Sequence, residues 1–204
     1  MAGGGSRKLK PILQPGSRVI ARYRARVSEQ LGSASLEPVG EGPAALFDDA
    51  LALAGLSAAA AVAAGALPER EPHPGAYLAF EALTQALAHT DYWPAVFVRY
   101  EAGLLQELGF GLDLTKCAAT GATEDLGYVS PKTGRAVSRA AAEPYKEKLV
   151  ELPAFLSTGG LPADNEELRK GLDLTGYFLE RHVFWPHNKP LPAARARFME
   201  TLQR

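Results

Sequence analysis

The sequence has little of what would indicate secretion, membrane insertion or disulfide stabilisation. Its 204 residues include one cysteine, Cys117, which excludes an internal disulfide and fits a reducing cytoplasm. Residues 1–5 contain no apolar segment of the kind found in secretory signals. The most apolar run, Ala50 to Leu67, is built on Ala and Gly and is interrupted by small residues, so we interpret it as a closely packed soluble helix rather than a membrane span.

Signatures of catalysis are also missing. The sequence contains no Walker A loop, no Rossmann glycine fingerprint, no G-x-S-x-G elbow and no H-E-x-x-H motif. Cys117 has no histidine close to it in the sequence, which favours a small buried apolar residue over a nucleophile. The acid pairs Asp48-Asp49 and Glu166-Glu167 lie where helices are expected to begin, and carboxylates there favour the helix dipole. We therefore expect a protein that is not an enzyme and needs no cofactor.

Metal ligands are equally scarce. His182 and His187 are five residues apart with Pro186 between them, a spacing that places them on different sides of a helix. His73 and His89 have no cysteine or carboxylate cluster around them. We expect no metal site.

Acidic residues are absent from the first 28 positions, and this absence is the strongest feature of the charge pattern. The net charge of −1 conceals a basic N-terminal arm of seven residues, namely Arg7, Lys8, Lys10, Arg18, Arg22, Arg24 and Arg26. The rest of the chain, from Ser28 onward, carries 15 basic and 23 acidic side chains. A basic arm on an acidic body indicates a polyanionic partner, and the alternative is an ordinary charged edge strand.

Between residues 17 and 27, the side chains on the two sides of the chain alternate with a period of two between mainly basic and apolar. A Gln-Pro-Gly turn at residues 14–16 comes before this segment. This pattern predicts a strand with one basic face and one apolar face, the latter formed by Val19, Ala21, Tyr23, Ala25 and Val27. Several arginines on one face can contact a phosphate backbone along several nucleotides. An exposed Tyr23 would offer a stacking surface for bases, but its place on the apolar face favours burial.

The remaining pattern predicts an α+β protein, in which a β fragment is followed by a mainly α-helical domain with a small β-hairpin insert. A second strand is expected at about residues 31–39. Helices are expected at about 44–66, at 75–89, after Asp91 as N-cap, at 139–148, at 165–184 and from 191 to 204. Phe97, Tyr100, Leu104 and Leu108 repeat at helical spacing, which indicates a core stripe. Residues 131–134 (PKTG) form a good hairpin turn.

Four segments resemble the RecO family of recombination mediators. Residues 6–16 (SRKLKPILQPG) resemble the basic loop and L-Q-P turn of its oligonucleotide-binding (OB) domain. Residues 99–113 (RYEAGLLQELGFGLD) resemble the family's R-F-E-x-x-L-L-x-x-L-G-Y-G-L-D stretch, and 117–121 (CAATG) and 128–138 (YVSPKTGRAVS) continue it. The resemblance implies an incomplete, partial OB-fold DNA-binding domain over residues 1–40. It also implies a helical RecO C-terminal domain over residues 41–204, with the hairpin insert at about 117–138.

The chain departs from this family pattern in two places. The OB domain would begin with two further strands before the L-Q-P turn, so the resemblance places Met1 inside the domain. Some relatives carry four cysteines around the hairpin as a zinc site. Here only Cys117 remains, with Thr120, Ala136 and Ser138 roughly where its partners would be expected. We therefore expect the zinc site to be lost.

The resemblance also implies partners and a function. Such proteins bind single- and double-stranded DNA, anneal strands coated with single-stranded-DNA-binding protein, and work with RecR to help load RecA, in the cytoplasm and at the nucleoid. Arg7, Lys8, Lys10, Arg18, Arg22, Arg24 and Arg26 are the expected DNA-binding residues. Arg99 is the candidate for binding the acidic tail of the single-stranded-DNA-binding protein, unless it pairs within the helical core, and Arg135 is a second candidate. The alternatives are a helical protein-interaction module that has lost DNA binding, and an uncharacterised hydrolase or transferase.

Overall fold

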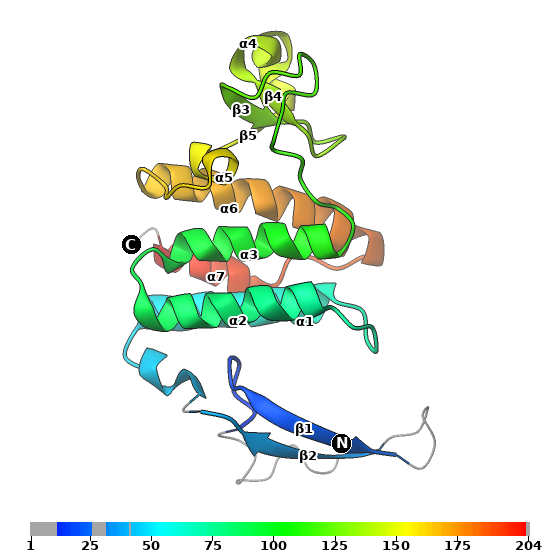
Figure 1. Ribbon diagram of the computed structural model, residues 1–204, viewed down its shortest axis with the longest axis vertical. Coiled ribbons are helices and arrows are strands. Elements are labelled where there is room, and N and C mark those ends of the chain that lie inside the picture. Colours follow the sequence, from blue (N-terminus) through cyan, green and yellow to red (C-terminus); the bar gives the residue numbers. More distant parts are fainter. Residues whose placement is uncertain (1–11, 26–31, 41, 203–204) are drawn as a thin grey trace.

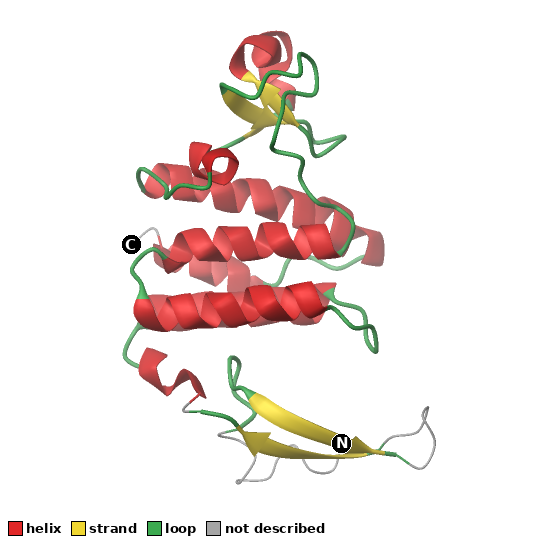
Figure 2. Ribbon diagram, viewed as in Figure 1, coloured by secondary structure: helices red, strands yellow, loops and turns green. Residues whose placement is uncertain are grey.

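The structure is a computed structural model and describes residues 12–25, 32–40 and 42–202. Three parts follow one another along its long axis (Figure 1): a two-stranded ribbon, a layered helical body, and a small sheet with short helices. Helices make up most of the described residues, and the two sheets lie at opposite ends of the long axis of the molecule (Figure 2). The predicted α+β class is confirmed.

The ribbon consists of β1 (Val19–Arg24) and β2 (Ser33–Pro38), which pair antiparallel from Val19↔Pro38 to Arg24↔Ser33. The predicted turn precedes it: the Ser17 amide donates to the Gln14 carbonyl at 3.0 Å, and Gly16 has a φ of 81° that favours glycine. Both strands lie within the predicted ranges, residues 17–27 and about 31–39. Val27 and Arg26, the far end of the first predicted strand, lie outside the described residues.

Five helices form the body: α1 (Ala50–Ala66), α2 (Pro74–His89), α3 (Trp93–Glu107), α6 (Asn165–Leu179) and α7 (Ala193–Leu202). Helix α1 packs on α7, α2 on α3, and α3 on α6. These pairings stack the helices in layers (Figure 1). No helix in the described ranges is both long and apolar enough to cross a membrane.

Two predicted helix starts are wrong. The first helix begins at Ala50 rather than at about Ala44, because Asp49 caps it by accepting a hydrogen bond from the Ala52 amide at 2.9 Å. The residues before the cap form a short 3-10 helix, η1 (Gly42–Leu46). Asp91 is not a cap: α3 begins at Trp93, after Tyr92, and no side chain caps it.

Small residues in α1 allow large aromatic rings to approach it. A Cβ atom added to Gly55 would lie 2.6 Å from Trp93, whose ring in turn packs against Phe198. The predicted stripe on α3 contributes Phe97, Tyr100 and Leu104 to the buried core. The Ala- and Gly-rich run is therefore a close helix packing surface, as predicted.

An ion pair is buried inside the helical body. The Arg195 guanidinium of α7 donates to both carboxylate oxygens of Glu101 on α3, at 2.7 and 2.8 Å. It also donates to the Leu172 carbonyl of α6 at 2.6 Å, and Thr175 donates to Glu101. Burial would lower the pKa of Arg195, but the charge of Glu101 and the hydrogen bonds to it hold that pKa above its usual value. The guanidinium therefore stays charged and joins three helices.

The second sheet has the strand order β4-β3-β5, with β3 (Leu126–Val129), β4 (Ala136–Ser138) and β5 (Val150–Glu151). The predicted hairpin turn closes β3 and β4: the Gly134 amide donates to the Ser130 carbonyl at 2.9 Å, and Gly134 has a φ of 66°. The short helices around this sheet are α4 (Arg139–Ala142) and α5 (Ala154–Thr158).

Two predicted helices prove to be composite. The one predicted over residues 139–148 is α4 followed by the 3-10 helix η2 (Glu143–Lys148). The one predicted over 165–184 is α6 followed by the π-helical turn η3 (Glu180–Phe184), and the 3-10 helix η4 (Trp185–His187) comes next. Asp164 caps α6 by accepting from the Glu167 amide at 2.8 Å, so the acid pair there lies in the first turn.

Cys117 is buried beside this sheet, as predicted. Its sulfur accepts hydrogen bonds from the amide and the hydroxyl of Ser138, at 3.3 and 3.5 Å. Burial would raise the pKa of the Cys117 thiol, but hydrogen bonds from Ser138 and Thr120 lower it to about 6. Ser138 thus occupies one of the positions where the resemblance placed a metal ligand, and it contacts the remaining thiol directly.

Candidate nucleic-acid interface

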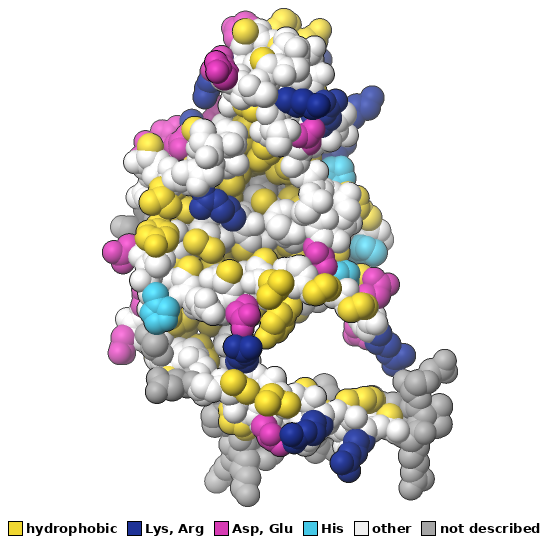
Figure 3. Space-filling view, viewed as in Figure 1, with side chains coloured by type: hydrophobic (Ala, Val, Ile, Leu, Met, Phe, Trp, Pro, Cys, Tyr) yellow, Lys and Arg dark blue, Asp and Glu magenta, His cyan; other side chains and the backbone are white. Residues whose placement is uncertain are grey.

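The ribbon presents its arginines to solvent at the end of the molecule. Arg18, Arg22 and Arg24 are all exposed, with 61% of the Arg18 side chain accessible. Basic side chains are visible along the outer part of the ribbon, away from the helical body (Figure 3). Arg22 and Arg24 lie on β1, and Arg18 comes immediately before that strand, so the structure places these three predicted site residues at one end of the molecule. The other four predicted DNA-binding residues, Arg7, Lys8, Lys10 and Arg26, lie outside the described residues.

The apolar face of the ribbon is open as well. The prediction that Tyr23 is buried is wrong, because 61% of it is exposed. Its hydroxyl accepts a hydrogen bond from the Gly32 amide at 2.8 Å, which ties it to the neighbouring strand. The physical reason is that a two-stranded sheet has a covered face only where another layer packs on it. Tyr23 is thus exposed, which is the alternative that its position in the sequence disfavoured.

Of Arg18, Arg22 and Arg24, two already have acidic partners. Arg18 Nη1 lies 3.0 Å from Glu81 Oε1 on α2, and Arg22 pairs with Glu37 on β2. Arg24 makes no ion pair with any residue that the structure describes. Exposed pairs of this kind contribute about 0–1 kcal/mol, so a phosphate group can compete with the carboxylates. Sequence reasoning missed both pairs, because the acids belong to a later strand and a later helix.

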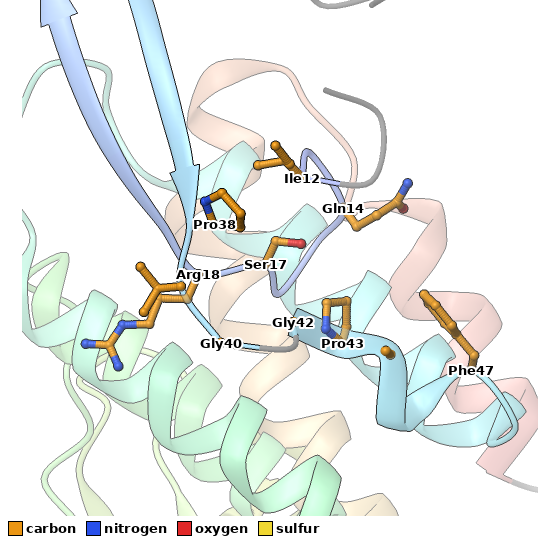
Figure 4. Close-up of a pocket in the computed structure, with 11 residues that line it drawn as sticks. Ile12, Gln14, Ser17, Arg18, Pro38, Gly40, Gly42, Pro43 and Phe47 are labelled. Atoms are coloured by element: carbon orange, nitrogen blue, oxygen red, sulfur yellow. The ribbon is translucent and has the colours of Figure 1, made fainter. Parts of the chain in front are cut away.

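A pocket of about 490 Å³ lies where the ribbon meets η1. Figure 4 shows Ile12, Gln14 and Phe47 around it, while the Arg18 side chain points away from them toward the helical body. The pocket is lined mainly by apolar groups and backbone, and no sequence motif marked it. Its place beside the turn at residues 14–17 makes it part of the same end of the molecule as the basic ribbon.

Arg99 and Arg135 lie on other elements. Arg99, on α3, donates to the Phe155 carbonyl at 3.3 Å and to the Gly160 carbonyl, and its guanidinium lies 5.6 Å from the centre of the Phe155 ring. Leu161, next in the chain, is an exposed apolar side chain. Arg135, on the hairpin, lies 3.5 Å from Asp113. Arg99 therefore holds α5 against the body, and a role in partner binding stays a prediction for both residues.

The described residues contain no group of three or more His, Cys, Asp or Glu side chains close enough to hold a metal ion. His182 lies between the rings of Phe110 and Phe178, with ring centres 5.3 and 5.6 Å away. Burial and the charge of Arg181 lower the pKa of His182. This histidine is part of an aromatic stack.

Comparison with known proteins identifies the family. The family model described as "Recombination protein O C terminal" matches residues 48–191. The chain is 72% identical to the DNA repair protein RecO of Phenylobacterium zucineum over 204 residues, which cover 99% of the chain and 83% of that protein. It is 66% identical to the DNA repair protein RecO of Caulobacter vibrioides (strain NA1000 / CB15N), with the same coverage, and 51% identical to that of Rhodospirillum centenum, covering 97% of the chain and 79% of that protein. The chain therefore belongs to the RecO family, as its motifs predicted.

Proposed function

We propose that this chain is a non-enzymatic mediator of DNA repair and homologous recombination that binds DNA through the basic ribbon. The observation that carries the proposal is the exposure of Arg18, Arg22 and Arg24, on the ribbon and immediately before it, in a chain of the RecO family. Phosphate attraction depends on charge density more than on exact shape, so the binding has little sequence preference. Exposed Tyr23 adds a ring on which a base can stack.

The proposed role extends to annealing of strands coated with single-stranded-DNA-binding protein. The mediator binds single- and double-stranded DNA, promotes annealing of complementary strands, and helps load RecA together with RecR. It works in the cytoplasm at the nucleoid, where its DNA substrate lies. The family resemblance supports these steps, and the exposed basic ribbon supports the first of them.

The DNA-binding proposal is tested by fluorescence anisotropy with a labelled oligonucleotide at several salt concentrations. A variant with Ser at Arg18, Arg22, Arg24 and Arg26 is expected to lose affinity. Affinity falls as salt rises, and each lost phosphate contact should make the slope of log affinity against log salt shallower by about 0.7–0.9. The charge-matched control carries Ser at four exposed basic residues of the opposite end, Lys132, Arg139, Lys146 and Lys148, and should bind like the parent. Equal affinity of parent and ribbon variant at every salt concentration would contradict the proposal.

A second candidate function is a helical protein-interaction module without DNA binding. Acidic partners for Arg18 and Arg22 favour it, because they reduce the charge that the ribbon offers to phosphate. The same titration separates the two functions: this candidate predicts no salt-dependent DNA affinity in the parent protein.

Arg99 is the proposed contact for the acidic C-terminal tail of the single-stranded-DNA-binding protein. It combines a cation with a neighbouring exposed apolar side chain, Leu161. Arg99→Ala is expected to weaken binding of a tail peptide by about 1–3 kcal/mol, the range for a charge-assisted hydrogen bond. Arg169→Ala, which removes an exposed arginine of α6, is the control, and calorimetric titration measures both. Unchanged affinity in a folded Arg99→Ala variant would leave Arg99 with only its contacts to Phe155 and Gly160. Arg135→Ala tests the second candidate in the same way.

A further inference from the structure

One ion pair joins the residue before β1 to the helical body, beside a cavity. Arg18 stands just before β1, and its guanidinium leaves the ribbon to meet Glu81 on α2 at 3.0 Å. The two partners differ in exposure: 61% of the Arg18 side chain is accessible, but only 25% of that of Glu81. A ligand from solvent can therefore reach the arginine more easily than the acid. The Arg22–Glu37 pair is different, because both its members belong to the ribbon and move together with it.

The rest of this junction is loosely filled. A cavity of about 230 Å³ lies beside the pair, lined by Gly16 and Val39 from the ribbon side and by Leu56 and Gln85 from the helices. Gly16 approaches Leu56 closely, since a Cβ atom at Gly16 would lie 3.1 Å from the Leu56 side chain. Strands β1 and β2 otherwise pack mainly on each other. The Arg18–Glu81 pair is thus one of the contacts that orient the ribbon on the body, together with the approach of Gly16 to Leu56 and the packing of η1 on α1 and α2.

We propose that Glu81 occupies Arg18 in place of a DNA phosphate and holds the ribbon against α2 until DNA displaces it. A carboxylate and a phosphate present the same kind of acceptor to a guanidinium, so the two compete for the Arg18 N–H donors that face Glu81. DNA that takes Arg18 releases the ribbon from α2, while Gly16 and Leu56 keep its base attached. This inference rests on the proposed DNA binding, and it adds an intramolecular competitor, Glu81, for one of the DNA-binding arginines.

The test is a double-mutant cycle on DNA affinity with Arg18→Ser and Glu81→Gln, measured by fluorescence anisotropy at low salt. Glu81→Gln frees Arg18 and is expected to tighten DNA binding about two- to fivefold, the range for losing one competing exposed ion pair. The same change in the Arg18→Ser background should have no effect, because the arginine for which Glu81 competes is gone. Glu147→Gln removes the same charge from an exposed position at the other end of the molecule and should bind like the parent.

Hydrogen exchange measures the release of the ribbon from α2, both in the free protein and with DNA bound. Glu81→Gln and Arg18→Ser should each speed amide exchange in β1 and β2 of the free protein, whereas Glu147→Gln should not. In the parent protein, adding a saturating oligonucleotide should give α2 around Glu81 faster exchange than in the free protein.

The outcomes separate this inference from the proposed function. If Glu81→Gln tightens binding equally in both backgrounds, Glu81 acts as a remote charge and the competition does not exist. If Glu81→Gln has no effect while the four-serine ribbon variant still loses affinity, DNA binding stands and the competition is refuted. If neither the parent nor Glu81→Gln binds DNA, both proposals fail.

Discussion

Glu101 and Arg195 are 94 positions apart in the chain and meet in the centre of the helical body. Glu101 is fully buried, and the guanidinium of Arg195 lies over Gly176, where a Cβ atom would come within 2.7 Å of it. The pair spans α3, α6 and α7 through its contacts with Leu172 and Thr175. At the scale of single residues, the main polar determinant of the body is this pair, and no local pattern in the sequence indicates it.

Removing one member of the pair should be costly. Arg195→Ala leaves the Glu101 charge buried without its partner, and we expect the free energy of unfolding to fall by about 3–5 kcal/mol in urea denaturation. The double variant Glu101→Gln with Arg195→Met removes both charges at similar volume and should recover much of the loss. The exposed pair Arg169–Asp173, at 2.8 Å, is the control: Arg169→Ala should change stability by less than about 0.5 kcal/mol. A small effect of Arg195→Ala would mean that water or another cation reaches Glu101.

At the scale of elements, contacts between helices decide whether a position tolerates a larger side chain more than intrinsic helix propensity does. Gly55 and Gly103 both lie inside helices, and replacing either with Ala would raise helix propensity. Their surroundings differ: Gly55 faces the Trp93 ring, while the nearest atom to a Cβ at Gly103 is the Ala79 Cβ at 3.9 Å. The same substitution should therefore have opposite signs in α1 and α3.

We expect Gly55→Ala to destabilise the protein by about 1–3 kcal/mol, because the Trp93 ring must move from a position 2.6 Å from the new methyl group. Gly103→Ala is expected to stabilise it by about 0.5–1 kcal/mol. Thermal or urea unfolding of both variants measures the change in stability and its sign. Stabilisation by Gly55→Ala would show that the Trp93 ring repacks at little cost.

At the scale of the whole molecule, burial is uneven. The helical body and the second sheet contain the buried clusters, and α3 and α6 contribute most of the largest fully buried side chains. The described ribbon residues are exposed or at most half-buried. A segment held by few buried contacts opens at a lower free energy than the core that it joins. The end of the molecule that we propose to bind DNA is therefore also its least stabilised part.

Hydrogen exchange should reveal this difference directly. Amides of β1 and β2 should exchange at least about a hundredfold faster than those of α3 and α6, because the strands lack a covering layer while those helices lie in the core. Adding a DNA oligonucleotide should slow exchange in the ribbon if its arginines bind phosphate. Equal protection of ribbon and core without DNA would show that another surface covers the strands.

The sequence by itself determined the class of fold, most element boundaries, the family and the location of positive charge. Alternation around Arg18, Arg22 and Arg24, the core stripe of α3 and the PKTG turn are local patterns, so they could be read without coordinates. Tertiary structure alone decided what lies against those residues. It left Tyr23 exposed because no layer covers the ribbon, gave Arg18 a carboxylate from α2, and engaged Arg99 with α5. Such contacts join residues that are far apart in the chain, and only packing brings them together.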